Sequence, residues 1–216
     1  MTIGTKSVLY GAHCFLIHPF FLAAAWLRLY GLRAVEDPYV GSVSIFNWRL
    51  WVAFCIHDLG YLGKQNMDGE EGEAHPYWAG KVILRFSRKP WHDFVVYHSR
   101  FLAKKDGMTY SLLCVADKMA LAMEPRWFYL VRVVATGEIR EYMALAGARN
   151  AESKYAEEPQ TKYESAGLDL STRWSWCTNM QEYVRNWAFE HRLGKVDTWT
   201  PDASQRQAAD ETGVWK

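Results

Sequence analysis

Histidines and aspartates are the residues through which this sequence could do chemistry. Six of the seven histidines lie before residue 100, and His57 precedes an aspartate directly at the end of an apolar segment. His98 follows Phe94 and Val95 at offsets of four and three, which places it on the helix face expected to point inward. Asp117 stands on an apolar stripe in the same way, and a buried carboxylate is costly unless it is paired or binds a metal.

Each of these residues also has a purely structural interpretation. His98 could be a hydrogen-bonded core histidine, Asp117 could pair with Lys118 or Arg126, and His75 could cap the helix that it precedes. Taken together, however, imidazoles and carboxylates on the inner faces of four or five helices predict a binding site for one or two borderline divalent metals. The candidate ligands are His18, His57, Asp58, His75, His98 and Asp117.

The order of these residues resembles the HD superfamily of metal-dependent phosphohydrolases. Its pattern is a His, then His-Asp, then optional further histidines and a distant Asp. The segment 56–60, Ile-His-Asp-Leu-Gly, is similar to the central signature of the family. Residues 73–80 resemble the His-Pro-x-x-Gly segment of the HD-GYP branch, and residues 115–118 resemble the closing Ala-Asp segment. The resemblance covers about residues 13–123.

The sequence departs from this pattern in three places. His13 competes with His18 for the role of first ligand, and we favour His18 because a small apolar stretch follows it. Tyr61 stands where HD-GYP proteins carry a lysine, and the Gly-Tyr-Pro segment is absent, which argues against hydrolysis of cyclic di-GMP. The glutamate that often follows His-Asp in the nucleotidase branch is missing, so an acidic residue of the following loop would have to substitute. The candidates are Asp68, Glu70, Glu71 and Glu73.

The resemblance implies a role for each residue. One metal would take His18, His57, Asp58 and Asp117, and a second would take His75 and His98 and share Asp58 as a bridge. Either would be Mn, Fe, Co, Ni or Zn. Asp58 is then catalytic, and basic side chains are needed to hold the phosphate. We expect Arg100, Lys118 and Lys64 in this role, with Lys104 and Lys105 as further candidates or as parts of an ordinary exposed turn.

These roles predict a metal-dependent phosphohydrolase that cleaves a phosphate ester of a small molecule, with a nucleotide as the favoured substrate. The region 81–149 supports a phosphorylated substrate because it holds 12 basic residues against 6 acidic ones. The same ligands also fit a different class, the di-iron oxygenases of HD type that act on a polyol or a phosphonate. A metal-free HD scaffold that acts as a binding module is a third interpretation, which the complete ligand set disfavours.

The elements that must position these residues are helical. Apolar spacing and stop signals predict an all-α chain, because no segment alternates with a period of two, and the family resemblance implies that its fold is an HD-domain helical bundle. We expect a single domain, with residues 1–148 as the metal-binding core and 149–216 as a peripheral extension packed through its aromatic residues. The expected helices are 8–30, either continuous or split or kinked at Pro19, then 46–59, 73–86, 91–102, 110–123, 126–145 with a break near Gly137, and 178–193.

Composition limits the remaining choices. Half of the 216 residues are hydrophobic and the net charge is +1, which excludes wholesale disorder and predicts no stable binding to nucleic acid. The apolar stretch that ends at Arg28 is interrupted by His18 and Pro19 and is too short to span a membrane. The four cysteines are scattered without a CxxC pair, which favours a reduced, cytoplasmic protein. A homo-oligomer is compatible with all of this.

Overall fold

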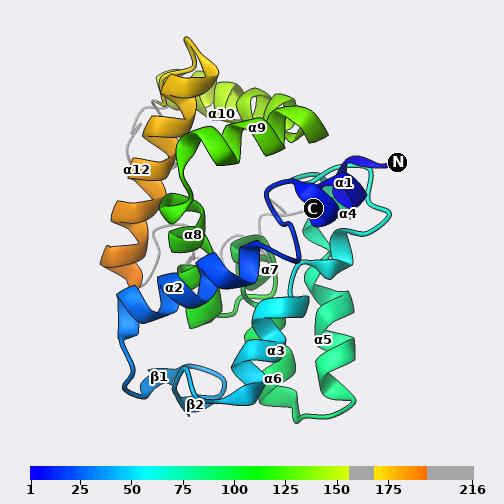
Figure 1. Ribbon diagram of the computed structural model, residues 1–216, viewed down its shortest axis with the longest axis vertical. Helices are drawn as coiled ribbons and strands as arrows, with labels where there is room; N and C mark the ends of the chain where they lie inside the picture. Colours follow the sequence, from blue (N-terminus) through cyan, green and yellow to red (C-terminus); the bar gives the residue numbers. More distant parts are fainter. Residues whose placement is uncertain (156–167, 194–216) are drawn as a thin grey trace.

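The structure is a computed structural model that describes residues 1–155 and 168–193 (Figure 1). It is mostly helical, in agreement with the predicted all-α class. The helices are α1 (Ile3–Tyr10), α2 (His18–Tyr30), α3 (Trp48–Ile56), the 3₁₀ turn η1 (Leu59–Tyr61), α4 (Glu70–Glu73), α5 (Pro76–Leu84), α6 (Lys89–Val96), α7 (Arg100–Lys105), α8 (Leu112–Met123), α9 (Arg126–Thr136), α10 (Glu138–Tyr155) and α12 (Arg173–His191).

Helix α8 is the centre of the core. Helices α2 and α12 pack against it, and α5 packs against α6 beside this group (Figure 1). Apolar residues cover nearly every side of this helix. Its fully buried residues include Leu113, Val115, Ala116, Met119 and Ala120. Burial of this kind supplies most of the free energy that holds helices together. Helix α8 is therefore a rigid support for any side chain that it carries.

The segment expected to be helical over 8–30 is split, as the alternative with a break at Pro19 allowed, because α1 ends at Tyr10 and α2 begins at His18. Gly11 ends α1 where the chain passes close to Glu138. A Cβ atom at this glycine would lie 1.9 Å from the carboxylate oxygen of Glu138. Pro19 then stands in the first turn of α2, where a missing N–H is no loss. The break places His18 at the start of α2.

The helices expected over 91–102 and 73–86 are also interrupted. Ser99 caps α7 by accepting a hydrogen bond from the backbone N–H of Leu102, so α6 ends before it and His98 lies in the turn between the two helices. Helix α5 begins only at Pro76, so His75 lies at the helix start rather than on a helix face. By contrast, the break expected near Gly137 is confirmed, since this residue adopts a φ of +90° between α9 and α10.

A small antiparallel hairpin was not expected from the sequence. Strands β1 (Val35–Asp37) and β2 (Gly41–Val43) pair with Val35 opposite Val43. The buried carboxylate of Asp37 accepts hydrogen bonds from the backbone N–H groups of Tyr39 and Val40 in the turn and of Leu112 at the start of α8. This carboxylate ties the hairpin to α8, a long-range contact that alternation of residue types does not reveal.

The C-terminal part of the described chain contributes to the main core. Trp176 and Trp187 of α12 are buried in the same cluster as α2 and α8, whereas Trp174 is half-exposed and Tyr183 is partly buried. Helix α12 begins at Arg173, before the expected start at 178, and α10 runs through the boundary expected at 148/149. The division into a core and an extension therefore stays a prediction. No helix in residues 1–155 and 168–193 has the length and apolar character needed to cross a membrane.

Candidate metal centre

The structure brings together all six residues that the sequence suggests as metal ligands. They come from the start of α2, the end of α3, the turns before α5 and α7, and the middle of α8. Their donor atoms form two groups, within each of which every atom lies within 4.8 Å of the others. One group is His18, His57, Asp58 and Asp117, and the other is Asp58, His75 and His98.

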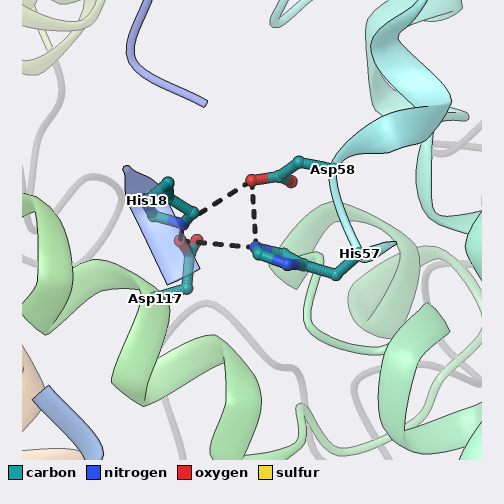
Figure 2. Close-up of side chains that lie close together, drawn as sticks. All are labelled: His18, His57, Asp58 and Asp117. Atoms are coloured by element: carbon teal, nitrogen blue, oxygen red, sulfur yellow. Dashed lines mark hydrogen bonds and ion pairs between the residues drawn. The ribbon is translucent and has the colours of Figure 1, made fainter. Parts of the chain in front are cut away.

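The first group pairs two imidazoles with two carboxylates (Figure 2). His18 Nε2 lies 2.9 Å from Asp117 Oδ1 and 3.6 Å from Asp58 Oδ2. His57 Nε2 lies 2.9 Å from Asp58 Oδ2 and 3.8 Å from Asp117 Oδ1. Asp117 is the most accessible member, with 26% of its side chain exposed, whereas the other three are nearly inaccessible. The group is therefore buried on one side and open to a ligand on the other.

Asp58 belongs to both groups through different oxygen atoms. Its Oδ2 faces His18 and His57, as described above. Its Oδ1 lies 3.4 Å from His75 Nε2 and 3.5 Å from His98 Nε2. A carboxylate that offers one oxygen to each of two donor sets has the arrangement of a bridging ligand. The geometry thus fits the shared role that the family resemblance implies for this residue.

Backbone carbonyls orient three of the imidazoles. His57 Nδ1 lies 3.2 Å from the carbonyl oxygen three residues before it, and the same contact is 2.7 Å at His75 and 2.6 Å at His98. A carbonyl oxygen only accepts hydrogen bonds, so Nδ1 is the donor and Nε2 is directed into the cluster. Metal-binding histidines are commonly held in this way by the ring nitrogen that does not bind the metal.

Two contacts in the cluster need a positive charge. The Nε2 atoms of His75 and His98 face each other at 3.1 Å, and two lone pairs at this distance repel unless a proton or a cation lies between them. His57 Nε2 and Asp58 Oδ2 are buried as an ion pair, and neither has a well-aligned hydrogen-bond partner among the described residues. Nitrogen and oxygen donors with unmet demand for a cation fit a borderline divalent metal.

The pKa values of the cluster also indicate a site that favours a positive charge. Burial favours the neutral form of Asp58, but His57, His13 and His75 outweigh it and hold the pKa of this carboxyl well below its ordinary value. Burial by itself would lower the pKa of His57, but the carboxylates of Asp58 and Asp117 raise it to about 10. Burial lowers the pKa of His75 to about 4. The carboxylates thus stay charged and retain a proton on His57, a positive charge that a metal could replace.

Residues 60 and 61 in η1 pack against the cluster at His75. A Cβ atom at Gly60 would lie 2.0 Å from the carbonyl oxygen of His75, so only glycine allows η1 to approach this turn. The ring of Tyr61 stacks on the imidazole of His75 with centroids 3.8 Å apart and an interplanar angle of 17°. Tyr61 therefore packs against a candidate ligand.

His13 belongs to a different network. Its Nδ1 lies 2.8 Å from Ser7 Oγ, and the Ser7 hydroxyl donates its proton to the fully buried carboxylate of Glu138. Glu138 further accepts hydrogen bonds from Thr136 and Tyr142. The His13 ring lines the same cavity as the cluster, with its centroid 6.1 Å from that of His18, but it belongs to neither donor group among the described residues. His18 is therefore the better candidate for the first ligand.

A cavity of about 1030 Å³ lies next to the cluster, and every candidate ligand except His57 lines it. Its lining includes four basic residues that the sequence analysis names, namely Arg100, Lys104, Lys105 and Lys118. Lys64 is not among the described lining residues. Its backbone carbonyl instead accepts a hydrogen bond from Gly4, which holds this residue against α1. The phosphate-binding role expected for Lys64 thus finds no support in its position.

Trp187, which contacts two of these cations, was not predicted to be part of the site. Arg100 Cζ lies 4.6 Å from the ring centroid of Trp187 in α12, and Lys118 Nζ lies 5.7 Å from it. Nothing in the local sequence distinguishes this tryptophan from the other aromatic residues. Of the acidic loop, Asp68 and Glu73 line the cavity, and Glu73 accepts a hydrogen bond from Ser99.

Comparison of the chain with models of protein families, with curated proteins and with solved structures finds no match in any of the three.

Proposed function

We propose that this protein is a metal-dependent phosphohydrolase of the HD type that cleaves a phosphate monoester of a small molecule. The observation that carries the proposal is the combination of two donor groups sharing Asp58 with a cavity over them that is lined by Arg100, Lys104, Lys105 and Lys118. Buried nitrogen and oxygen donors suit divalent metals, and clustered cations suit a phosphoryl group.

The six clustered residues would hold one or two ions of Mn, Fe, Co, Ni or Zn. When bound, such ions lower the pKa of a coordinated water to near neutrality and neutralise charge on phosphoryl oxygens. Burial of His57, Asp58, His75 and His98 excludes bulk water from the back of the site, which strengthens every electrostatic interaction in it.

The remaining steps fall to the side chains around the cluster. Arg100 offers several N–H donors in a planar fork that suits phosphoryl oxygens, and Lys118 adds a second positive charge one residue after Asp117. In the reaction a P–O bond to a water oxygen forms as the P–O bond to the alkoxide breaks. A proton from the water ends on the leaving alcohol, and the products are the alcohol and inorganic phosphate.

Metal-loaded protein tests this proposal directly. We expect phosphate release from at least one member of a panel of simple phosphate monoesters and nucleoside monophosphates, with Mn²⁺, Co²⁺, Ni²⁺ or Fe²⁺ present. Phosphate release from nucleoside di- and triphosphates alone would indicate cleavage of an anhydride bond instead of an ester bond. Nucleotides are the class that the sequence favours and belong first in the panel. Absence of phosphate release with every metal, in protein shown by elemental analysis to be loaded, would contradict the proposal.

Arg100 provides a matched test of the phosphate site. Arg100→Ala is expected to lower kcat/KM about tenfold to a hundredfold, the scale of one lost charge-assisted hydrogen bond. Arg88→Ala is the control, because Arg88 is exposed and is not among the cavity-lining residues. Steady-state kinetics with the best substrate of the panel measures both. Equal kinetics in the two variants would remove Arg100 from the site.

The di-iron oxygenase of the sequence analysis remains the second candidate function. The same His and Asp donors would hold two iron ions, and Asp58 faces both groups as such a centre requires. Oxygen uptake by iron-loaded protein on addition of a polyol or a phosphonate, without phosphate release from any ester, would favour this function over hydrolysis.

A further inference from the structure

The cavity over the cluster continues well beyond the space that a phosphoryl group needs. Along α8 its lining changes within one turn, from Asp117 and Lys118 to the apolar side chain of Leu121. A cavity of about 1030 Å³ has the size of sites that enclose a whole organic ligand. The region past Leu121 therefore has room for the part of the substrate that carries the phosphate.

Helix α12 extends this apolar region as a stripe. Trp176, Met180 and Val184 line the cavity at intervals of four residues, which places them on one face of the helix. Trp187, further along the same helix, contacts the cations Arg100 and Lys118 as described above. At 1.5 Å per residue, the stripe from 176 to 184 spans about 12 Å, and Trp187 lies about one turn beyond it. One helix thus connects the phosphate-binding cations with an apolar wall.

Aromatic rings that stack on Trp176 also line this wall. Tyr142 stacks on Trp176 with centroids 6.2 Å apart and an angle of 15°, and Tyr129 stacks on the same ring at 6.5 Å and 29°. The hydroxyl of Tyr142 donates to Glu138, which satisfies its polar atom. Leu145 of α10 completes the wall beside them. The surface offered to a ligand here is largely hydrocarbon and ring.

This chemistry argues against a nucleobase beside this wall. A base carries several hydrogen-bond donors and acceptors on its edge, and leaving them unpaired in an apolar site is costly. Among the described lining residues that follow Lys118 in the sequence, there is no Asn, Gln, Asp, Glu, Ser or Thr side chain. The polar side-chain atoms there are the hydroxyls of Tyr129, Tyr142 and Tyr183 and the indole N–H of Trp176, and the Tyr142 hydroxyl already donates to Glu138. An apolar chain has no such requirement, and each methylene that it buries strengthens binding.

We infer that the substrate, if the proposed hydrolysis is correct, is the phosphate monoester of an apolar alcohol, such as an alkyl or prenyl phosphate. Its phosphoryl group lies at the metal-binding cluster with Arg100 and Lys118, and its chain lies along the stripe of α12 toward Trp176. The reaction balances as written above, with the P–O bond to the apolar alkoxide broken and the alcohol released with a proton from water.

Binding of methyl-, butyl- and octylphosphonate tests the apolar wall without any reaction. These probes carry a C–P bond that ester hydrolysis does not cleave, and titration calorimetry with Mn²⁺-loaded protein under anaerobic conditions measures their affinity. We expect the dissociation constant to fall about fourfold for each early methylene, and at least a hundredfold from methyl- to octylphosphonate. Equal affinities along the series, or tighter binding of a nucleoside monophosphate than of octylphosphonate, would overturn the inference.

Two variants test where the hydrocarbon chain of the ligand binds. Leu145→Gln and Leu121→Gln place a polar amide in the wall at partly buried positions, and either serves if the other does not fold. We expect octylphosphonate to bind at least tenfold more weakly and methylphosphonate to bind as before. Ala144→Gln is the matched control, because Ala144 is exposed and is not among the lining residues. Octylphosphonate affinity unchanged in both wall variants would place the chain elsewhere and contradict the inference.

Phosphate release from methyl and octyl phosphate separates this inference from the proposed function. Chain-dependent binding without release of phosphate from either ester would refute hydrolysis but leave the apolar subsite standing. Hydrolysis of both esters and of nucleotides with no dependence on chain length would support the proposed function and refute the apolar subsite.

Discussion

At the scale of single residues, the site depends most on Asp58. Its two carboxylate oxygens face different groups of histidines, at 2.9 Å from His57 and at 3.4 Å from His75. Burial of this carboxylate would be unfavourable without the positive charge that surrounds it. A change at this residue should therefore affect both donor groups at once.

Replacing Asp58 by Ala is predicted to abolish activity and to reduce bound metal at both groups, because each group loses an oxygen donor. Elemental analysis of protein purified anaerobically measures the metal, and a phosphate-release assay measures turnover. Asp169→Ala serves as the control, since Asp169 is exposed and far along the chain from the cluster. Full metal content and full turnover in the Asp58 variant would show that the assignment is wrong.

A narrower prediction concerns His75 and His98. They form a donor group with Asp58 alone, so His75→Ala or His98→Ala should lower metal content while the group of His18, His57 and Asp117 keeps its ion. The control is His92→Ala, since His92 lies on α6 and pairs with Asp93 instead. If neither variant changes the metal stoichiometry, the site holds one ion and the second group has another role.

At the scale of elements, the candidate ligands lie mostly where helices begin and end. His57 follows the last residue of α3, His75 precedes α5, and His98 lies between α6 and α7. Such positions let side chains from different helices converge, because the chain turns there and each imidazole finds a backbone carbonyl three residues back. The turns, rather than the helix faces, give the cluster its shape.

Gly60 tests the importance of these turns. Gly60→Ala is predicted to destabilise the fold by about 1–3 kcal/mol and to weaken metal binding by His75, because the new methyl group would overlap the His75 carbonyl. Urea unfolding and metal titration measure the two effects. Gly147→Ala is the control. Gly147 lies within α10, and a Cβ atom there would lie at an ordinary distance of 3.5 Å from Leu170, so this substitution should be neutral or stabilising. Equal stability of the two variants would refute the close contact.

At the scale of the whole molecule, the cluster joins segments that are far apart in the sequence. His18 and Asp117 are 99 positions apart and lie 2.9 Å from each other. Helices α2 and α8, which carry them, also pack against each other in the core. An ion bound between such segments binds the folded chain and not the unfolded one, so it must stabilise the fold.

Metal removal is accordingly predicted to lower stability. At a free metal concentration one hundred times the dissociation constant, the free energy of unfolding should exceed that of the metal-free protein by about 2.7 kcal/mol. Thermal unfolding with added metal and with a chelator measures this difference. The Asp58→Ala protein should unfold at the same temperature under both conditions. If the chelator does not change the melting temperature of the wild-type protein, this result would argue against a bound metal in the core.

The sequence by itself predicted the helical class, the six candidate donor residues and the break at Gly137, because these depend on residue type and short spacing. The division of the donors into two groups that share Asp58 came only from the family resemblance. Only the tertiary structure decided where the helices of His18 and His98 begin and end, which cations reach the cavity, and that α12 lines it. Those outcomes depend on contacts between distant residues, such as Gly11 with Glu138 and Arg100 with Trp187, and no local pattern in the chain encodes such contacts.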